Sequence, residues 1–220
     1  MDFCSDMYEG LGFFGGYPSK EEFDKLIHAK VTAFVDLTTD REKRNLPFVY
    51  TSLVPTGATY LNFPILDNHA PKNRKLFLDL VYHVAHRLRK REKVYIHCRG
   101  GHGRSGILVA SLLCYLLNIQ PYQAIQRTTL YHSRRPNLKP KWKGAMCPQM
   151  YRQQKFIMDL FQPVLVSYHD YHRFMEKDPK KLIHYIGLRP VCTDASTPVI
   201  SELVYYIRQA VNHPGLSVKA

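Results

Sequence analysis

Residues 93–106 read KVYIHCRGGHGRSG, which predicts a strand, a tight loop and the start of a helix. The first five residues are rich in β-branched and aromatic side chains, as in a buried strand. Residues 107–117 are apolar almost all round, as in a buried helix. The glycines between the two elements mark the turn that joins them. This segment therefore predicts a strand–loop–helix unit within an α/β fold.

The loop of this unit has the composition of an anion-binding site. Gly100, Gly101 and Gly103 allow tight turns in which successive backbone N–H groups converge on one point. The N-terminus of the following helix adds positive potential there. Arg104, at the end of the loop, can donate parallel hydrogen bonds to two phosphate oxygens. We therefore expect a tetrahedral anion to bind in this loop.

Cys98 opens the same loop, where the positive field favours a thiolate. In such surroundings the pKa of a cysteine falls from about 8.5 into the range of roughly 3.5–7.5. Cys98 would then be a nucleophile aimed at the phosphorus atom. Ser105 would donate a hydrogen bond to the sulfur and ease its departure from a thiophosphate intermediate. The alternative is that the glycines form an ordinary turn and Cys98 is a small buried apolar residue.

The pattern Cys-x5-Arg-Ser, which is preceded by His97, resembles the signature loop of the protein tyrosine phosphatase superfamily. This resemblance implies that Cys98 is the nucleophile, that Arg104 grips the phosphate, and that His97 and Ser105 assist. It also implies that the phosphate is held by the whole loop, namely Arg99, Gly100, Gly101, His102, Gly103 and Arg104. No metal and no cofactor are expected, because the arginine and the backbone amides supply the charge stabilisation.

A second segment, residues 63–71, reads FPILDNHAP and resembles the mobile loop that carries the general acid in this superfamily. In the compact dual-specificity and regenerating-liver branches the acid follows a proline by a few residues, which implies Asp67. A carboxylic acid that protonates the leaving oxygen contributes about 10²–10⁴ in rate. His69 is the less favoured candidate. Taken alone, Asp67 and Asn68 would be interpreted as turn-forming residues.

Gln153 completes the set of expected site residues. Residues 148–156 read PQMYRQQKF and resemble the family segment in which a glutamine positions the hydrolytic water. Gln153 has the better offset from the flanking proline and phenylalanine, and Gln154 is its rival. A glutamine on a solvated helix face would give the same sequence pattern.

Strands and helices alternate outward from the loop. Before it, residues 19–22 form a capping box that begins a short helix, residues 31–37 and 58–63 have strand composition, and an apolar stripe from residue 73 predicts a longer helix. After it, helices are expected over 121–131 and 149–161, with a basic, proline-rich loop at 133–143 between them. The alternation predicts an α/β fold, a central, mostly parallel, twisted sheet flanked by helices.

The chain is expected to have two parts. Residues 1–162 would form a phosphatase domain of the dual-specificity type, and residues 163–220 a C-terminal extension. In the extension, Thr197-Pro198 predicts the start of a helix whose apolar face runs from Val199 to Val211. We expect a helical extension packed on the domain. The alternative is that this face contacts a second copy and makes a homodimer.

Charge and cysteine content limit the partners and the compartment. The 220 residues carry a formal charge of +13, which favours phosphate-rich ligands such as phosphoproteins, RNA or phosphoinositide headgroups. The sequence has no apolar stretch of membrane-spanning length and no signal-peptide core. Five scattered cysteines without CxxC spacing argue against disulfides and zinc sites. We expect a cytoplasmic protein, with the nucleus as the alternative.

The expected substrates are phosphoproteins carrying phosphotyrosine and phosphoserine or phosphothreonine. Larger tyrosine-specific relatives have a loop whose tyrosine deepens the pocket, and residues 39–51 offer only weak candidates such as Tyr50. A shallow, dual-specificity pocket is therefore expected from the resemblance.

Three alternatives stay open. Basic residues in the loop, Arg99 and His102, resemble those of phosphoinositide phosphatases. The basic loop that contains Trp142 would suit an RNA 5′-triphosphatase with the same cysteine chemistry, although Gly103 stands where that branch has asparagine. The third alternative is a catalytically silent phosphate-binding module, which the presence of nucleophile, arginine and acid argues against.

Overall fold

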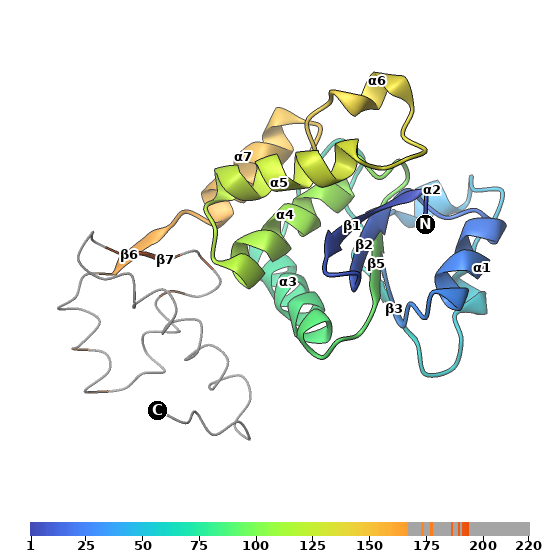
Figure 1. The fold of residues 1–220 in the computed structure, drawn as a ribbon, viewed down its shortest axis with the longest axis horizontal. Helices are drawn as coiled ribbons and strands as arrows, with labels where there is room; N and C mark the ends of the chain where they lie inside the picture. The colour runs from blue at the N-terminus through green and yellow to red at the C-terminus, as the bar shows by residue number, and fades with distance from the viewer. Residues whose placement is uncertain (167–172, 174–176, 178–185, 187–188, 190, 194–220) are drawn as a thin grey trace.

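The computed structural model describes residues 1–166, 173, 177, 186, 189 and 191–193. Its centre is a five-stranded sheet in the order β1-β2-β5-β3-β4 (Figure 1). The first pair of strands is antiparallel and the other pairs are parallel. The strands are β1 (Cys4–Tyr8), β2 (Gly12–Gly15), β3 (Ala33–Asp36), β4 (Thr59–Asn62) and β5 (Val94–His97).

Helices cover both faces of this sheet, and two buried clusters fill the space between the layers. The larger cluster lies beneath α3 (Arg74–Arg89), α4 (Arg104–Leu117), α5 (Pro121–Ser133) and α7 (Tyr151–Leu160). The smaller, aromatic cluster lies beneath α1 (Lys20–His28). Short helices α2 (Asp40–Lys43) and α6 (Pro140–Lys143) and a 3-10 turn (Thr51–Leu53) complete this part of the chain. The predicted α/β architecture is confirmed.

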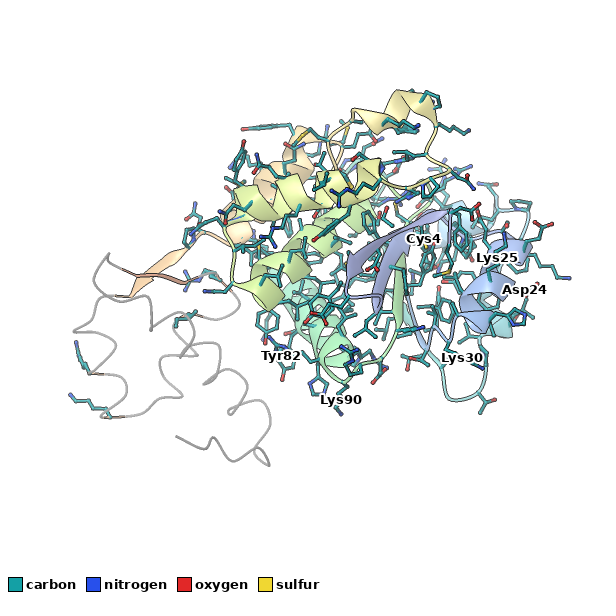
Figure 2. The ribbon with its side chains drawn as sticks, in the orientation of Figure 1. Cys4, Asp24, Lys25, Lys30, Tyr82 and Lys90 are labelled. Atoms are coloured by element: carbon teal, nitrogen blue, oxygen red, sulfur yellow. The ribbon has the colours of Figure 1, made fainter. Side chains whose placement is uncertain are left out.

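Local sequence explains where the helices begin and which side they bury. Ser19 caps α1 through the predicted capping box, and Asn73 caps α3 by accepting a hydrogen bond from the Leu76 N–H at 3.0 Å. On α1, Phe23 and Leu26 are buried, whereas Asp24 and Lys25 are exposed (Figure 2). This amphipathic pattern seats α1 on the sheet through its apolar side.

The central helix α4 begins at Arg104, three residues before the apolar run that predicted it. It is buried along its length from Arg104 to Leu116 because α3, α5 and α7 all pack against it. Its N-terminus therefore sits at the end of the buried strand β5, inside the molecule. This placement brings the loop at 98–103 to the carboxyl edge of the parallel strands.

Some elements were not predicted. The β1–β2 hairpin and α2 lack a strong periodic pattern, and the loop expected at 133–143 contains α6. Beyond α7, β6 (Val164–Val166) and β7 (Val191–Thr193) pair as parallel strands within the segment expected to be helical. The helix and dimer contact expected over 197–211 lie outside the described residues. None of the helices in the described part is long and apolar enough to cross a membrane.

Candidate active site

The loop between β5 and α4 can form only because glycine occupies position 101. Gly101 has a φ of +74°, and a Cβ atom there would lie 2.3 Å from the carbonyl carbon of Gly15. The loop is tied to the same neighbouring strand end by a hydrogen bond of 3.1 Å from the Tyr17 N–H to the Arg99 carbonyl oxygen. The predicted tight turn is thus packed directly against the backbone that follows β2.

Cys98 lies at the base of this loop and is 2% exposed. Its Sγ accepts a hydrogen bond from the Gly101 N–H at 3.2 Å and lies 3.7 Å from Ser105 Oγ. Ser105 is therefore placed to donate to the sulfur, as the resemblance implies. The sulfur also lies close to the N-terminus of α4, where the helix dipole is positive.

Arg104 is held by a carboxylate from a distant part of the chain. Its Nη1 and Nη2 donate to the two carboxylate oxygens of Glu42 at 2.7 and 2.8 Å, and Nη1 also donates to the Ile65 carbonyl oxygen at 3.0 Å. The guanidinium is 2% exposed, and its buried Nε has no acceptor among the described residues. A fixed, buried arginine with an unused donor fits a phosphate oxygen.

The pKa of Glu42 reflects this pairing. Burial alone would raise it, but hydrogen bonds from Arg104 and from the Thr39 backbone outweigh burial and lower the pKa from 4.5 to about 2. Glu42 therefore stays charged across the physiological range, and the ion pair persists. The same Thr39 is the N-cap of α2, with Glu42 as its capping-box partner.

Asp67 also faces Arg104. Its Oδ1 lies 2.9 Å from Nη2 of the arginine, and its side chain is 65% exposed. The neighbouring His69 turns its Nδ1 toward the Asp67 carbonyl oxygen at 2.7 Å, within its own loop. The structure thus brings the predicted acid, and not His69, into contact with Arg104.

Cys98 and Asp67 line one cavity of about 460 Å³. Gln153 lines it and is fully buried: its Nε2 donates to the His69 carbonyl oxygen at 3.1 Å and its Oε1 accepts from the Met150 N–H at 3.2 Å. Gln154 instead donates to the Pro148 carbonyl oxygen. The cavity is lined by Asp67, Asn68, Cys98, Arg99, Gly100, His102, Gly103, Trp142, Gln149 and Gln153.

Comparisons with known proteins show the family of this chain. A family model described as "Tc-R-P: Polymorphic toxin system, DSP-PTPase phosphatase" matches residues 10–117. A protein of Invertebrate iridescent virus 3 that is named as a tyrosine phosphatase (067L) is 41% identical over 170 residues, which are 76% of this chain and 68% of that protein. A second, from Invertebrate iridescent virus 6 (197R), is 42% identical over 122 residues, or 54% of this chain and 44% of that protein.

Solved structures show the same fold. Tk-PTP in its active form superposes with a TM-score of 0.59 at 25% identity, over 72% of this chain and 95% of that one. PTPMT1 in complex with PI(5)P superposes with a TM-score of 0.56 at 19% identity, over 72% of this chain and 97% of that one, and shows the fold alone.

The chain belongs to the protein tyrosine phosphatase superfamily. It is a cysteine-dependent phosphatase of the dual-specificity type.

The histidine that ends the strand before the phosphatase loop, His97, does not line the cavity. Its ring is fully buried, and its Nε2 is hydrogen-bonded to the Tyr50 hydroxyl. Burial lowers the pKa of His97 from 6.5 to about 4, against the opposing effect of Asp36. His97 is therefore a neutral residue, and its hydrogen bond to Tyr50 fixes the end of β5. Tyr50, a candidate for deepening the pocket, is likewise fully buried.

The other cysteines lie in different surroundings. Cys4, Cys114 and Cys147 are buried and form no disulfide. Burial raises the pKa of all three thiols, that of Cys4 to about 11. In the part of the chain that the structure describes, no three His, Cys, Asp or Glu side chains are grouped to hold a metal.

Sequence reasoning missed two charged residues of this phosphatase site. Glu42 holds Arg104 from 62 positions away, and its only sequence signal was the capping box Thr39-x-x-Glu42. The second is Arg135, which the sequence analysis placed only in the basic loop at 133–143. It lies just beyond the end of α5, and its Nη2 donates to the Gly101 carbonyl oxygen at 3.3 Å, which supports the loop at 98–103. A capping glutamate and a surface-loop arginine look ordinary in a sequence.

Proposed function

We propose that this phosphatase hydrolyses phosphotyrosine and phosphoserine or phosphothreonine on proteins, through a cysteinyl-phosphate intermediate on Cys98. The observation that supports this most directly is the grouping of three side chains. Cys98 and Asp67 line one cavity, Asp67 lies 2.9 Å from Arg104, and Arg104 is fixed with an unused Nε donor. Nucleophile, anion holder and acid are thus within reach of one phosphate group.

In the first step the Cys98 thiolate attacks phosphorus in line, forming the S–P bond as the ester P–O bond breaks. Backbone N–H groups of residues 99–103 and the Arg104 guanidinium stabilise the charge on the phosphoryl oxygens. Asp67, in its protonated form, gives its proton to the leaving oxygen, which departs as an alcohol or phenol. The products of this step are the dephosphorylated residue and cysteinyl-phosphate.

In the second step a water molecule attacks phosphorus and the S–P bond breaks. Asp67, now a carboxylate, accepts a proton from the water, and inorganic phosphate is released. Ser105 Oγ, 3.7 Å from the sulfur, donates a hydrogen bond to the departing thiolate. Gln153 keeps one N–H and one lone pair free, because each end of its amide makes a single hydrogen bond to the described residues. We assign it the positioning of this water.

The protein substrate class is inferred from the site walls. Tyr50, the nearest candidate for a pocket-deepening tyrosine, is buried in the aromatic cluster, which supports a shallow site open to phosphoserine and phosphothreonine as well as phosphotyrosine. Arg99, Trp142 and Gln149 line the cavity and can contact the polypeptide around the phosphoresidue. The four described thiols carry no disulfide, which suits a reducing compartment, and we assign the enzyme to the cytoplasm.

The test is phosphate release, without added metal, by wild type, Cys98→Ser and Asp67→Asn. Substrates are an aryl phosphate, a phosphotyrosine peptide, a phosphothreonine peptide, a phosphoinositide and a 5′-triphosphorylated RNA. We expect release from the aryl phosphate and both peptides, its loss in Cys98→Ser, and a fall of about 10²–10⁴ in Asp67→Asn on poor leaving groups.

Other results would contradict the proposal in distinct ways. Preference for the lipid or the RNA would show that the same cysteine chemistry acts on another class of substrate. Absence of release from every substrate, with retained phosphate binding, would make the chain a phosphate-binding module. Release that needs a divalent cation, or that survives Cys98→Ser, would overturn the cysteinyl-phosphate mechanism.

A further inference from the structure

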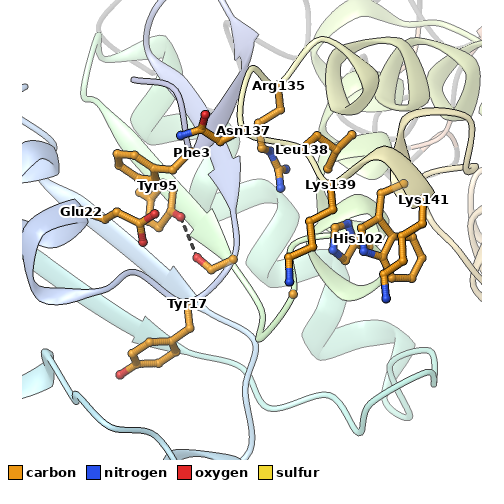
Figure 3. Close-up of a pocket in the computed structure, with 13 residues that line it drawn as sticks. Phe3, Tyr17, Glu22, Tyr95, His102, Arg135, Asn137, Leu138, Lys139 and Lys141 are labelled. Atoms are coloured by element: carbon orange, nitrogen blue, oxygen red, sulfur yellow. Dashed lines mark hydrogen bonds between the residues drawn. The ribbon is translucent and has the colours of Figure 1, made fainter.

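Two cavities adjoin the catalytic cavity, and they differ in chemistry. The first, drawn in Figure 3, is lined by charged side chains such as Lys139 and Lys141. The second, of about 530 Å³, lies on the far side of the loop at 63–71 that carries Asp67, and we call it the apolar groove. Its volume is in the range of about 300–1,000 Å³ that is typical of ligand sites. The apolar side chains in its lining are Phe63, Pro64, Ile65, Leu66, Ala70 and Leu76.

A single turn separates the apolar groove from the catalytic cavity. Residues 66–69 form a β-turn, in which the His69 N–H donates to the Leu66 carbonyl oxygen at 3.0 Å and Asn68 has a φ of +60°. The two central residues, Asp67 and Asn68, line the catalytic cavity. The two end residues, Leu66 and His69, line the apolar groove. A polypeptide whose phosphoresidue is bound in the catalytic cavity therefore has the groove across this turn.

The rim of the groove exposes leucine side chains to water. Leu66, in the turn, is 49% exposed, and Leu76, on α3, is 55% exposed, whereas Ile65 in the same lining is buried. Exposed apolar side chains around an apolar hollow mark an interaction site, because a partner that covers them removes their surface from water. The groove therefore suits an apolar side chain of a partner.

Charge and position indicate which partner this is. The lining contains no carboxylate, and its one lysine, Lys72, forms no ion pair with the described residues. An apolar side chain with an acidic residue beside it would fit these walls, and a basic residue would not. An extended chain advances about 3.3 Å per residue, so a residue a few positions from the phosphoresidue can cross the turn. The substrate polypeptide itself is thus the partner that reaches the groove.

The groove also includes backbone groups that hold catalytic side chains. The Ile65 carbonyl oxygen accepts a hydrogen bond from Arg104 Nη1 at 3.0 Å, and the His69 carbonyl oxygen accepts one from Gln153 Nε2 at 3.1 Å. Asp67 lies between these two residues in the chain. A side chain seated in the groove would restrict this stretch in its catalytic position, so its binding should raise kcat as well as lower KM.

We propose that the apolar groove binds an apolar side chain of the protein substrate, from a residue a few positions away from the phosphoresidue. The inference rests on the proposed function and adds a specificity site to it. Leu66 and Leu76 cover the bound side chain from the turn and from α3, and Lys72 favours an acidic neighbour. The enzyme is therefore selective for phosphoresidues that lie near leucine, isoleucine or phenylalanine.

The test uses phosphotyrosine peptides of one length in which the flanking residues are alanine. Leucine replaces alanine at each of the neighbouring positions in turn, on both sides of the phosphotyrosine. We expect at least one position to raise kcat/KM by about tenfold, which corresponds to about 1.4 kcal/mol, with part of the gain in kcat. Leu76→Asp should abolish the ratio between the leucine and alanine peptides, and Leu76→Ala should reduce it.

Leu130→Asp is the matched control, because Leu130 is a leucine of α5 that is 45% exposed and does not line the groove. This variant should keep the leucine-to-alanine ratio and hydrolyse an aryl phosphate at the wild-type rate. The ratio is the decisive quantity, since a general loss of activity in a variant cancels from it. Equal kcat/KM for all peptides, a ratio that survives Leu76→Asp, or an equal loss in Leu130→Asp would overturn the proposed specificity site.

Failures of the two proposals can be told apart. Normal hydrolysis of the aryl phosphate and of the alanine peptide, without any gain from leucine, removes only the specificity site. Absence of aryl phosphate hydrolysis removes the proposed function itself. A gain that depends on Leu76 but is confined to a long-chain phosphoinositide over its short-chain form, and is absent from every peptide, would show that the groove holds a lipid chain instead.

Discussion

Among single residues, the ion pair between Arg104 and Glu42 gives the site its rigidity. An arginine side chain loses considerable rotamer freedom when it binds phosphate, and a partner that fixes it beforehand reduces that loss. Glu42 does so through two parallel hydrogen bonds of 2.7 and 2.8 Å, which leave Nε for the substrate. The carboxylate acts on the reaction only through the arginine and is therefore a positioning residue.

Glu42→Gln tests this role. The amide cannot balance the buried guanidinium and presents an N–H group to another donor, so we expect the free energy of unfolding to fall by about 2–3 kcal/mol. We expect kcat/KM for an aryl phosphate to fall about a hundredfold, because the arginine loses its orientation. Thermal unfolding and steady-state kinetics measure the two effects. Glu92→Gln, which breaks the 2.6 Å pair with Arg87, should leave kcat/KM unchanged.

The stability difference between wild type and Glu42→Gln should become smaller in acid. The pKa of Glu42 is lowered in the folded protein, from 4.5 to about 2. Its contribution is therefore complete above pH 4.5 and is lost as the pH falls toward 2. The gap in Tm between wild type and Glu42→Gln should be constant above pH 4.5 and close below it. A gap that widens on acidification would contradict the assignment.

At the level of elements, the phosphatase loop depends on close contact between two backbone segments. The loop at 98–103 rests on the chain that leaves β2, and Gly101 is where they touch. Positive φ alone would favour glycine at this position. The neighbouring backbone also leaves no space for a side chain at position 101, since neither segment can move without displacing a strand of the central sheet.

Gly101→Ala should therefore damage both stability and activity. Its Cβ would lie 2.3 Å from the Gly15 carbonyl carbon and 2.5 Å from the Gly16 nitrogen. Backbone strain and overpacking together should cost about 3 kcal/mol or more. Phosphate-release assays should show near-complete inactivation.

Gly144→Ala provides the control for this prediction. Gly144 has a φ of −99°, and a Cβ atom at this position would have no heavy atom within 4 Å. Its substitution should therefore change stability by less than about 0.5 kcal/mol. Comparable Tm values for the two variants would show that the loop can relax. The loop would then not need glycine at position 101.

For the whole molecule, two buried histidines and one half-buried histidine make stability sensitive to mild acid. The pKa values of His97, His102 and His132 are lowered from 6.5 to about 4, 4 and 3, with burial as the largest cause. The folded protein thus keeps them neutral, whereas the unfolded chain binds their protons below pH 6.5. Stability should fall as the pH decreases from 6.5 toward 4.

Thermal unfolding at a series of pH values checks this prediction. Wild-type Tm should decline steadily below pH 6.5, and His132→Gln should decline less steeply because one titrating group is gone. His28→Gln, at an exposed histidine, should follow the wild-type slope. A wild-type Tm that stays constant between pH 7 and 5 would contradict the prediction.

The sequence by itself determined what is encoded within a short stretch of chain. Cys98, Gly101, Arg104 and Ser105 lie within one strand–loop–helix unit, so their proximity follows from chain connectivity. The cap of α1 and the apolar face of α3 are equally local, and the structure confirms them. Asp67 was predicted only through the family resemblance, because nothing local distinguishes it from a turn former.

Only the tertiary structure decided which distant side chains meet that loop. Glu42 pairs with Arg104, Arg135 supports Gly101, and His97 turns into the aromatic cluster instead of the cavity. Each of these contacts joins residues more than thirty positions apart and depends on how the helices pack on the sheet. Periodicity and capping rules describe a residue's own element, and they carry no information on the side chain that packing brings opposite it.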